Sequence, residues 1–541
     1  MKPPLKLFLA KIIKLRSKRN PAEEVRQDQP PLFRVNRLPP EYTPKTPPYK
    51  VGEADIYVDE ETYYVEDPNL SEEAIRVYRE TLDRKLRWLP PELFYDDQKL
   101  VEAIGSTQTG AQTLLYYVRR ELKGYSVLQP LIDDPGVEDI VIAAPNTPVS
   151  VKYRGRTLKT NISFSEVELN ELAQRLAAMA GKPVSTYNPL LSMRLPDGNR
   201  LTLNYGLEVS HRGTSIALRK FPANPWSITQ LMQLGSVVPD LLAWLWILIE
   251  NRKALLVCGT SGVGKTSLIN ALTCFIPSNA RIVTVEDTGE FKLSHPYWTP
   301  LIARYSYTQN KYAEISLDQL VKHALRMSAD YIIVGEVRGE EGASWAQSIL
   351  TGHGGLTSIH SETPELATQR LVSPPISVEP QSLSALHAVV EVRAAGSKRY
   401  ISSVLDYEYQ PQSPVFKRVY QAGHPSSAML KDEEILDLPT SRLLIEQGIY
   451  TQNELLEELR MRRELLEVVS SASQVDPELL THDSVSKISW AYQANPELRA
   501  KPNELLRVLR PLCHNCSAPL RSDGSCPMCG EAEELEKAIE T

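Results

Sequence analysis

The stretch KALLVCGTSGVGKTSLINAL, residues 253–272, restricts the fold of this chain more than any other segment. An apolar run over 254–258 leads into a glycine-rich loop that matches G-x-x-x-x-G-K-[ST], and a helix-forming segment follows. The glycines let successive backbone N–H groups face one phosphate, and the helix N-terminus adds its positive end. The sequence therefore predicts a nucleotide-binding loop formed by Gly259, Thr260, Ser261, Gly262, Val263, Gly264, Lys265, Thr266 and Ser267.

Two side chains of this loop have distinct predicted roles. Lys265 would reach the β- and γ-phosphates of ATP, and the Thr266 hydroxyl would bind Mg²⁺. Residues 226–410 alternate segments typical of strands and helices, which predicts a parallel α/β sheet around the loop. The apolar run LLAWLWILIE at 241–250 is too short to span a bilayer and predicts a buried helix.

Acidic residues follow the next two predicted strands. RIVTVED ends in Glu286 and Asp287, and YIIVGEVRGEE carries Glu336 directly after its apolar run and one glycine. The carboxyl ends of parallel strands meet at the edge of the sheet where ligands bind. Gly335 occupies a position where many P-loop proteins carry an aspartate, so Glu336 would serve as base, as an outer-shell Mg²⁺ partner, or as both. Taken singly, each acid is also compatible with a surface charge, but their occurrence after a P-loop in sheet order favours a role at the site.

The segment TGHGGLTSIH, residues 351–360, contains His353 and His360. Their spacing corresponds to two helical turns, but the glycines around them argue against one helix through both. The pair alone is compatible with a metal site, with a chance occurrence, or with a part of a larger molecular machine.

Four motifs occur in a fixed order: CGTSGVGKTS, TVEDTGE, LRMSADYIIVGEVRGEE and TGHGGLTSIH. Together they resemble the secretion ATPase superfamily, which includes motors of type II secretion, type IV pili and archaeal surface filaments, and the wording is closest to the archaeal branch. The resemblance implies a RecA-like P-loop motor domain. It implies that Glu336 is the catalytic carboxylate and that Glu286 and Asp287 form an aspartate box. It further implies that His353 and His360 couple the γ-phosphate to domain movement.

The resemblance extends upstream to about residue 130, through LIDDPGVEDIVI, MRLPDGNRLTLN and SHRGTSIALRKF. It implies an α+β domain whose arginines approach the nucleotide and stabilise phosphate charge. A purely structural role is equally open for each of them, and Arg304 and Arg338 are weaker candidates. The matching candidates are Arg194, Arg200, Arg212 and Arg219.

A cysteine cluster ends the sequence. CHNCSAPLRSDGSCPMCG holds two C-x-x-C pairs, and four thiolates fit a closed, structural Zn²⁺ site, with a redox pair as the alternative. Related motors that carry such a module have it inserted in the motor domain, so its position here departs from their pattern. The predicted zinc ligands are Cys513, Cys516, Cys526 and Cys529.

The remaining sequence divides by composition. The first residues carry apolar side chains at helical spacing with basic ones between them, as in an amphipathic helix on an anionic membrane or in a partner groove, and a basic disordered tail is equally open. Ser165 is a predicted helix N-cap, and Asp197-Gly198 a predicted hairpin turn. The predicted organisation is a basic, Pro-rich tail (1–50), a helical region (51–125), an α+β domain (126–224), a RecA-like ATPase domain (225–425), a helical region (426–510) and a zinc ribbon or knuckle (511–532).

These features predict an Mg²⁺-dependent ATPase that powers pilus-like filament assembly or type II-like protein secretion. A homo-hexameric ring, a polytopic membrane platform protein as partner, and a cytoplasmic location at the membrane follow from the resemblance alone. The net charge of −7 argues against a general nucleic-acid binder, so no nucleic acid is expected. Two alternatives stay open: a motor for nucleic-acid translocation, DNA uptake or conjugation, and a nucleotide-binding adaptor with little turnover.

Overall fold

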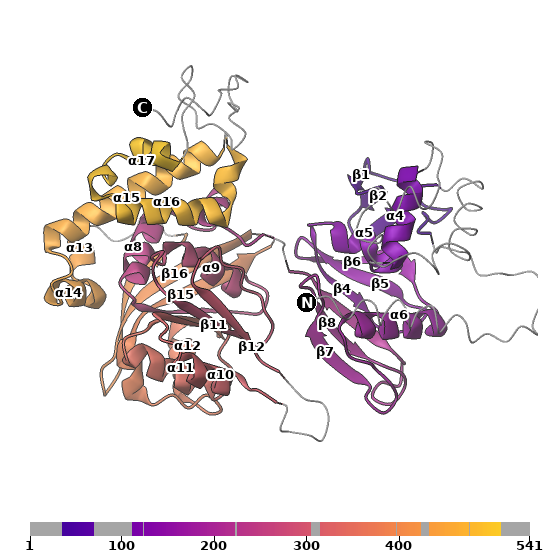
Figure 1. Ribbon diagram of the computed structural model, residues 1–541, viewed down its shortest axis with the longest axis horizontal. Helices are drawn as coiled ribbons and strands as arrows, with labels where there is room; N and C mark the ends of the chain where they lie inside the picture. Colours follow the sequence, from indigo (N-terminus) through magenta and orange to yellow (C-terminus); the bar gives the residue numbers. More distant parts are fainter. Residues whose placement is uncertain are drawn as a thin grey trace, which may run out of the picture. The chain divides into compact units, whose positions relative to one another are not determined.

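The structure is a computed structural model of the chain, which divides into two compact units, Met1–Pro222 and Ala223–Thr541. Each unit is described by itself (Figure 1). The division lies close to the boundary predicted between 224 and 225. The structure describes residues 35–69, 111–122, 124–221, 224–304, 314–396, 398–423, 432–474 and 476–509.

Unit 1 is built on a nine-stranded sheet with the strand order β1-β2-β3-β6-β5-β4-β9-β8-β7. Most neighbouring strands are antiparallel, whereas β3 and β6 are parallel. The elements are β1 (Tyr49–Val51), β2 (Ala54–Val58), β3 (Thr62–Glu66), α4 (Ala111–Leu122), η3 (Ser126–Leu128), α5 (Gln129–Asp133), β4 (Val137–Ile142), β5 (Pro148–Tyr153), β6 (Arg156–Ser163), α6 (Glu166–Met179), β7 (Leu190–Arg194), β8 (Arg200–Asn204) and β9 (Ser215–Arg219).

The local signals of unit 1 fold as predicted. Ser165 caps α6 through a capping box, in which its hydroxyl accepts from the Glu168 N–H and the Glu168 carboxylate accepts from the Ser165 N–H. The hairpin β7–β8 turns at Asp197 and Gly198, where Gly198 has a φ of 97°. Alternate strand residues and one side of α6 form a single core.

The predicted helical region over 51–125 is wrong in its first part, because β2, β3 and the end of β1 occupy it. Alternate residues of these strands are buried, including Ile56, Tyr63 and Val65. Two tyrosine hydroxyls, of Tyr49 and Tyr63, donate to the buried Asp134 carboxylate at 2.6 and 2.5 Å and tie the strands to α5. The predicted helix around AQTLLYYVRREL is present as α4.

Unit 2 is built on an eight-stranded sheet with the order β12-β11-β13-β14-β10-β15-β16-β17. The strands from β12 to β15 are parallel, and β16 and β17 extend the sheet antiparallel. The elements around the sheet are α7 (Ile228–Gln233), α8 (Pro239–Glu250), β10 (Ala254–Gly259), α9 (Lys265–Leu272), η4 (Thr273–Phe275), β11 (Ile282–Glu286), β12 (Trp298–Ile302), α10 (Leu317–Ala324), β13 (Tyr331–Val334), α11 (Glu341–Leu350), β14 (Gly354–His360), α12 (Pro364–Val372), η6 (Pro380–Ala385), β15 (Leu386–Ala395), β16 (Lys398–Glu408) and β17 (Val415–Gln421).

Helices cover both faces of this sheet, with α8 and α9 on one face and α10, α11 and α12 on the other (Figure 1). Strand β10 contributes alternate residues to the two cores: Leu255 and Val257 to one, Leu256 and Cys258 to the other. A strand buried on both faces needs a continuous apolar run, which explains the sequence before the glycine-rich loop. Both cysteines of this unit that are described, Cys258 and Cys274, are buried.

A helical bundle packs on the face that carries α8 and α9. It comprises α13 (Asp432–Leu436), α14 (Pro439–Glu446), α15 (Gln452–Ser473), η7 (Pro477–Leu480), α16 (His482–Ala494), η8 (Pro496–Leu498) and α17 (Pro502–Leu509). Arg462 of α15 is almost fully buried and lies 2.8 Å from Glu250 at the end of α8 and 3.0 Å from Glu458. The bundle therefore belongs to unit 2 and is not a separate module.

Among the described residues no helix is both long and apolar enough to cross a bilayer. The predicted amphipathic tail and the four zinc-ligand cysteines lie outside these ranges, so both stay predictions.

Candidate functional site

The glycine-rich loop lies between β10 and α9, at the carboxyl edge of the sheet of unit 2. Gly259 ends the strand with a φ of 152°, and a Cβ there would come within 2.4 Å of the Val392 carbonyl on β15. The loop must therefore leave the strand through a glycine. Gly264, with a φ of 94°, starts α9, so the backbone N–H groups at the start of this helix point toward the loop.

Lys265, at the start of α9, is almost completely buried. Its ammonium donates to the carbonyls of Gly259 and Thr260 at 3.1 Å each and contacts Nδ1 of His360 at 3.0 Å. Burial lowers the pKa of Lys265, and the nearby Glu336 carboxylate opposes that shift. The lysine is thus held inside the loop where a phosphate would meet it.

His360 connects the loop to the carboxylate predicted to be catalytic. Its Nε2 lies 2.8 Å from Oε1 of Glu336. Burial and the positive charge of Lys265 lower the pKa of His360. A lysine ammonium can only donate, so Nδ1 of the neutral ring accepts and the ring proton resides on Nε2, which contacts Oε1 of Glu336 without hydrogen-bond geometry. The loop lysine, the imidazole and the carboxylate therefore form one continuous polar row.

Glu336 is held in the loop that follows β13. Its other oxygen, Oε2, accepts a hydrogen bond from the Arg338 guanidinium at 2.5 Å. The loop itself is fixed by Glu341, whose carboxylate accepts from the N–H groups of Arg338 and Gly339. Ser358 of β14 donates to the Gly335 carbonyl and ties the loop to the neighbouring strand. Arg338, a weaker candidate from the sequence, therefore belongs to the site.

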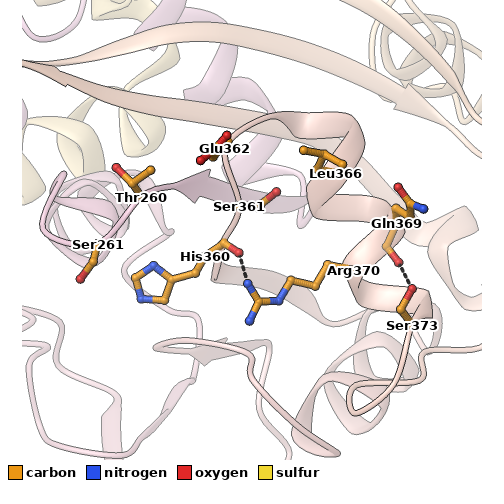
Figure 2. A pocket seen from close by; sticks show the side chains of 9 residues that line it. All are labelled: Thr260, Ser261, His360, Ser361, Glu362, Leu366, Gln369, Arg370 and Ser373. Carbon is orange, nitrogen blue, oxygen red and sulfur yellow. Dashed lines mark hydrogen bonds between the residues drawn. The ribbon is translucent and has the colours of Figure 1, made fainter.

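A pocket of about 580 Å³ opens beside the glycine-rich loop, and Figure 2 shows its lining residues. In this view His360 stands between Thr260 and Ser261 of the loop and Arg370 of α12. The Arg370 guanidinium donates to the His360 carbonyl. The pocket is lined by Thr260, Ser261, His360, Ser361, Glu362, Leu366, Gln369, Arg370 and Ser373.

Glu286, predicted as part of the aspartate box, ends β11 but has only 2% of its surface exposed. Its carboxylate accepts from the N–H groups of Glu290 and Phe291 and from the Thr284 hydroxyl. Burial raises the pKa of Glu286 to about 7, against the effect of these hydrogen bonds. Through these hydrogen bonds Glu286 holds the loop after β11 in shape. Asp287 is the next residue on that loop.

The two predicted histidines do not share a site. His360 ends β14, whereas His353 directly precedes the strand at its opposite end. A strand of this length separates them by about 20 Å. Nδ1 of His353 contacts the Ser348 carbonyl at 3.0 Å and the Thr351 hydroxyl at 3.1 Å, so His353 helps to end α11.

The candidate arginines of unit 1 lie on neighbouring strands. Arg194 on β7 faces Arg200 on β8, which in turn faces Arg219 on β9. Arg219 is paired with Asp139 at 3.0 Å, and Arg194 donates to the Gly198 carbonyl. Arg212 lies outside this row, exposed in the turn before β9. Three of the four arginines thus form one row across the sheet.

Within the described ranges, no group of three or more His, Cys, Asp or Glu side chains is placed to hold a metal ion. A P-loop Mg²⁺ needs fewer protein ligands, because phosphates and waters supply the rest. Thr266 follows Lys265 at the start of α9, and the acidic Glu336 is held at the same edge of the sheet by its contact with His360. These two residues fit such an ion.

Sequence analysis missed the pocket residues of α12. Arg370 and Gln369 lie in an ordinary amphipathic helix with no motif of their own. The available signal was the position of this helix, which begins directly after the segment that ends in His360.

The residues of this site lie in a part of the chain that is similar to known proteins. Residues 121–404 match the family described as Type II/IV secretion system protein. An uncharacterized protein of Methanocaldococcus jannaschii is 32% identical over 392 residues, which cover 70% of this chain and 69% of the relative. The type IV secretion system protein PtlH of Bordetella pertussis is 29% identical over 265 residues, 43% of this chain and 76% of the relative.

A solved structure, the VirB11 ATPase of the Brucella suis type IV secretion system in complex with sulphate, is similar with 25% identity and a TM-score of 0.28. It covers 53% of this chain and 93% of that chain. The family match spans more than half of the sequence and includes the glycine-rich loop, Glu336 and His360. Unit 2 has the RecA-like motor fold, and the chain belongs to the type II/IV secretion system protein family.

Proposed function

We propose that this chain hydrolyses ATP at the glycine-rich loop of unit 2 and works as a motor of a secretion or filament-assembly system. The observation that carries this proposal is the row from Lys265 through His360 to Glu336. It places a phosphate-binding cation and a carboxylate at the same edge of the sheet, with one imidazole between them. Phosphoryl transfer depends on such positioning and charge stabilisation.

The residues divide the work in the following way. The loop N–H groups and Lys265 bind the β- and γ-phosphates. Glu336 orients a water molecule for attack on the γ-phosphorus and accepts its proton as the bond to the β–γ bridging oxygen breaks, which yields ADP and phosphate. His360 contacts both Lys265 and Glu336, so it holds the carboxylate in register with the phosphate. Arg338 keeps the second carboxylate oxygen fixed.

Mg²⁺ neutralises charge on the β- and γ-phosphates when it is bound with ATP. Thr266 would hold it through its hydroxyl, with Glu336 in the outer shell. Asp287, on the loop shaped by Glu286, is a further candidate for the outer shell. By the resemblance to the secretion ATPases, the proposal also gives charge stabilisation of the phosphates to the candidate arginines Arg194, Arg200, Arg212 and Arg219.

The wider role rests on the family and on the relatives. PtlH is named a type IV secretion system protein, and the VirB11 structure is that of a type IV secretion ATPase. The resemblance of the four sequence motifs to the secretion ATPase superfamily extends the proposal to a homo-hexamer that works on the cytoplasmic side of a membrane, against a polytopic platform protein. A structural Zn²⁺ bound by Cys513, Cys516, Cys526 and Cys529 forms part of the same proposal. Filament assembly and protein secretion both remain within it.

The test is steady-state phosphate release by the full-length chain with Mg-ATP, beside the Glu336→Gln variant. The assay is run alone, with anionic lipid vesicles and with single-stranded DNA. Turnover that depends on Glu336 and rises with vesicles supports the membrane-associated motor. Stimulation by DNA alone would replace it with a nucleic-acid motor. Binding of ATP with no Glu336-dependent turnover under any of these conditions would replace it with the adaptor.

A further inference from the structure

Arg370 lies beside the nucleotide site without belonging to any of its motifs. It projects from α12, the helix that follows His360, and lines the pocket together with Thr260 and Ser261 of the glycine-rich loop (Figure 2). In the part of the chain that the structure describes, its hydrogen-bond partner is the backbone carbonyl of His360. Arg370 is exposed, and a guanidinium has five N–H donors in a planar fork, so this bond leaves most of its donors available to a ligand in the pocket.

The charges around the pocket are unbalanced. Lys265, Arg338 and Arg370 are cationic, and the charge of Arg370 is felt at both Lys265 and His360, where it lowers the pKa. Glu336 is already engaged by Arg338 and His360. Glu362 also lines the pocket but is exposed to solvent. The arrangement therefore favours an additional anion between the loop and α12.

The two neighbouring arginines differ in what they can offer to such an anion. Arg338 is held by a charged partner, the Glu336 carboxylate, at 2.5 Å. Among the described residues, the hydrogen-bond partner of Arg370 is a neutral carbonyl, reached through one of its nitrogens. A charge-assisted, bidentate hydrogen bond to a phosphate is stronger than a bond to a carbonyl. Exchanging the carbonyl for a phosphate would therefore stabilise the bound state.

We propose that Arg370 binds the γ-phosphate of ATP from the side of α12 and so makes the site distinguish ATP from ADP. The proposal rests on the proposed function, because it assumes that the glycine-rich loop binds ATP. Lys265 contacts His360, and His360 lines the pocket, so a γ-phosphate bound by Lys265 would lie next to this pocket. ADP has no γ-phosphate, so Arg370 would contribute nothing to the free energy of ADP binding.

The experiment measures the dissociation constants of Mg-ADP and of a non-hydrolysable Mg-ATP analogue for the full-length chain and for Arg370→Gln. The variant should bind the ATP analogue at least about ten-fold more weakly, because a hydrogen bond to a charged group is lost. Binding of ADP should not change. Arg370→Lys keeps the charge without the fork and should recover part of the affinity for the analogue.

Arg460→Gln is the matched control. This arginine is similarly exposed on α15 and pairs with Glu464 at 2.9 Å, away from the pocket. The control should change neither dissociation constant. Equal weakening of ADP and ATP analogue in Arg370→Gln would assign Arg370 a structural role through the His360 carbonyl and overturn the proposal. Unchanged binding of both would overturn it as well. If the wild-type chain binds neither nucleotide, the proposed function itself fails, which is a different result.

Discussion

Nε2 of His360 lies 2.8 Å from Oε1 of Glu336, and the opposite nitrogen of the same ring contacts Lys265. The imidazole therefore links the phosphate-binding lysine to the carboxylate proposed as base. Because burial and the charge of Lys265 lower the pKa of His360, the ring is neutral at neutral pH, with Nδ1 as the acceptor and the proton on Nε2. If ATP binds as proposed, a phosphate that draws Lys265 away from the ring would remove the partner of Nδ1 and alter an imidazole that also contacts Glu336.

Replacement of Glu336 by glutamine should separate binding from hydrolysis. The amide keeps the shape and still meets Arg338, but it cannot accept a proton from water. Turnover should fall by about 10²-fold or more, as expected for loss of a general base, while ATP affinity is retained. Phosphate release and equilibrium nucleotide binding, measured on the same preparation, check the loss of turnover and the retained affinity. Equal loss of binding and turnover would instead assign Glu336 to nucleotide binding.

The two histidines should respond differently to substitution, although both lie in one motif. His360→Gln removes the link between Lys265 and Glu336 and should lower kcat, with a smaller effect on KM. His353→Gln changes only the end of α11, about 20 Å away along β14, and should leave kcat close to that of the wild type. Steady-state kinetics of the two variants side by side provide the measurement. A similar loss of kcat in both would show that His353 acts on the site at a distance.

The separation of the histidines also shows where sequence reasoning stops. The glycines after His353 argued correctly against a helix, but a strand was not evident from them. In the structure Gly354 is the first residue of β14. Its position requires glycine, because a Cβ there would come within 2.4 Å of the Tyr331 ring on β13. These glycines permit close packing between strands, and such packing depends on a residue more than twenty positions away. No local sequence pattern indicates this packing between strands.

The same reason divides the rest of the fold into predictable and unpredictable parts. The strand, the glycine-rich loop and α9 are consecutive, so spacing alone specified them, and Ser165 and the Asp197-Gly198 turn are equally local. By contrast, β3 joins the sheet by pairing with β6, about a hundred residues later. Arg370 reaches the pocket only because α12 folds back over the strand that ends in His360. These contacts arise from tertiary packing, which overrides local propensity.

Glu286 should prove to be a loop-shaping residue whose loss destabilises the motor unit. Glu286→Ala leaves the buried N–H of Phe291 and the part-buried N–H of Glu290 without their acceptor, at about 1–3 kcal/mol for a buried group. Glu286→Gln retains a carbonyl oxygen for them and should be much milder. Denaturant unfolding of the two variants, followed by a probe in unit 2, tests this. If Glu286→Gln unfolds as readily as Glu286→Ala, the negative charge itself is required.

The pH dependence of stability should reveal two opposing buried groups in the motor unit. Glu286 has a folded pKa of about 7 against a usual value of 4.5, so the folded chain binds more protons between these values, and stability falls as pH rises through that window. His482 of α16 is buried against Asn270 and Thr273, and burial lowers its pKa from 6.5 to about 4. Here the unfolded chain binds more protons, so stability rises with pH between about 4 and 6.5.

Each contribution amounts to about 3 kcal/mol across its window, and because they have opposite signs they nearly cancel in the wild type. Asp406, with a pKa raised to about 6 by burial, and His387, with a pKa lowered to about 3 by burial, form a second opposing pair. Glu286→Gln should therefore make unit 2 lose stability on acidification from pH 7 to pH 5. His482→Gln should make it gain stability over the same range, and the double variant should again be nearly flat. Unfolding midpoints of the four proteins at pH 5, 6 and 7 decide the matter, since parallel pH profiles would mean that neither group titrates as its burial requires.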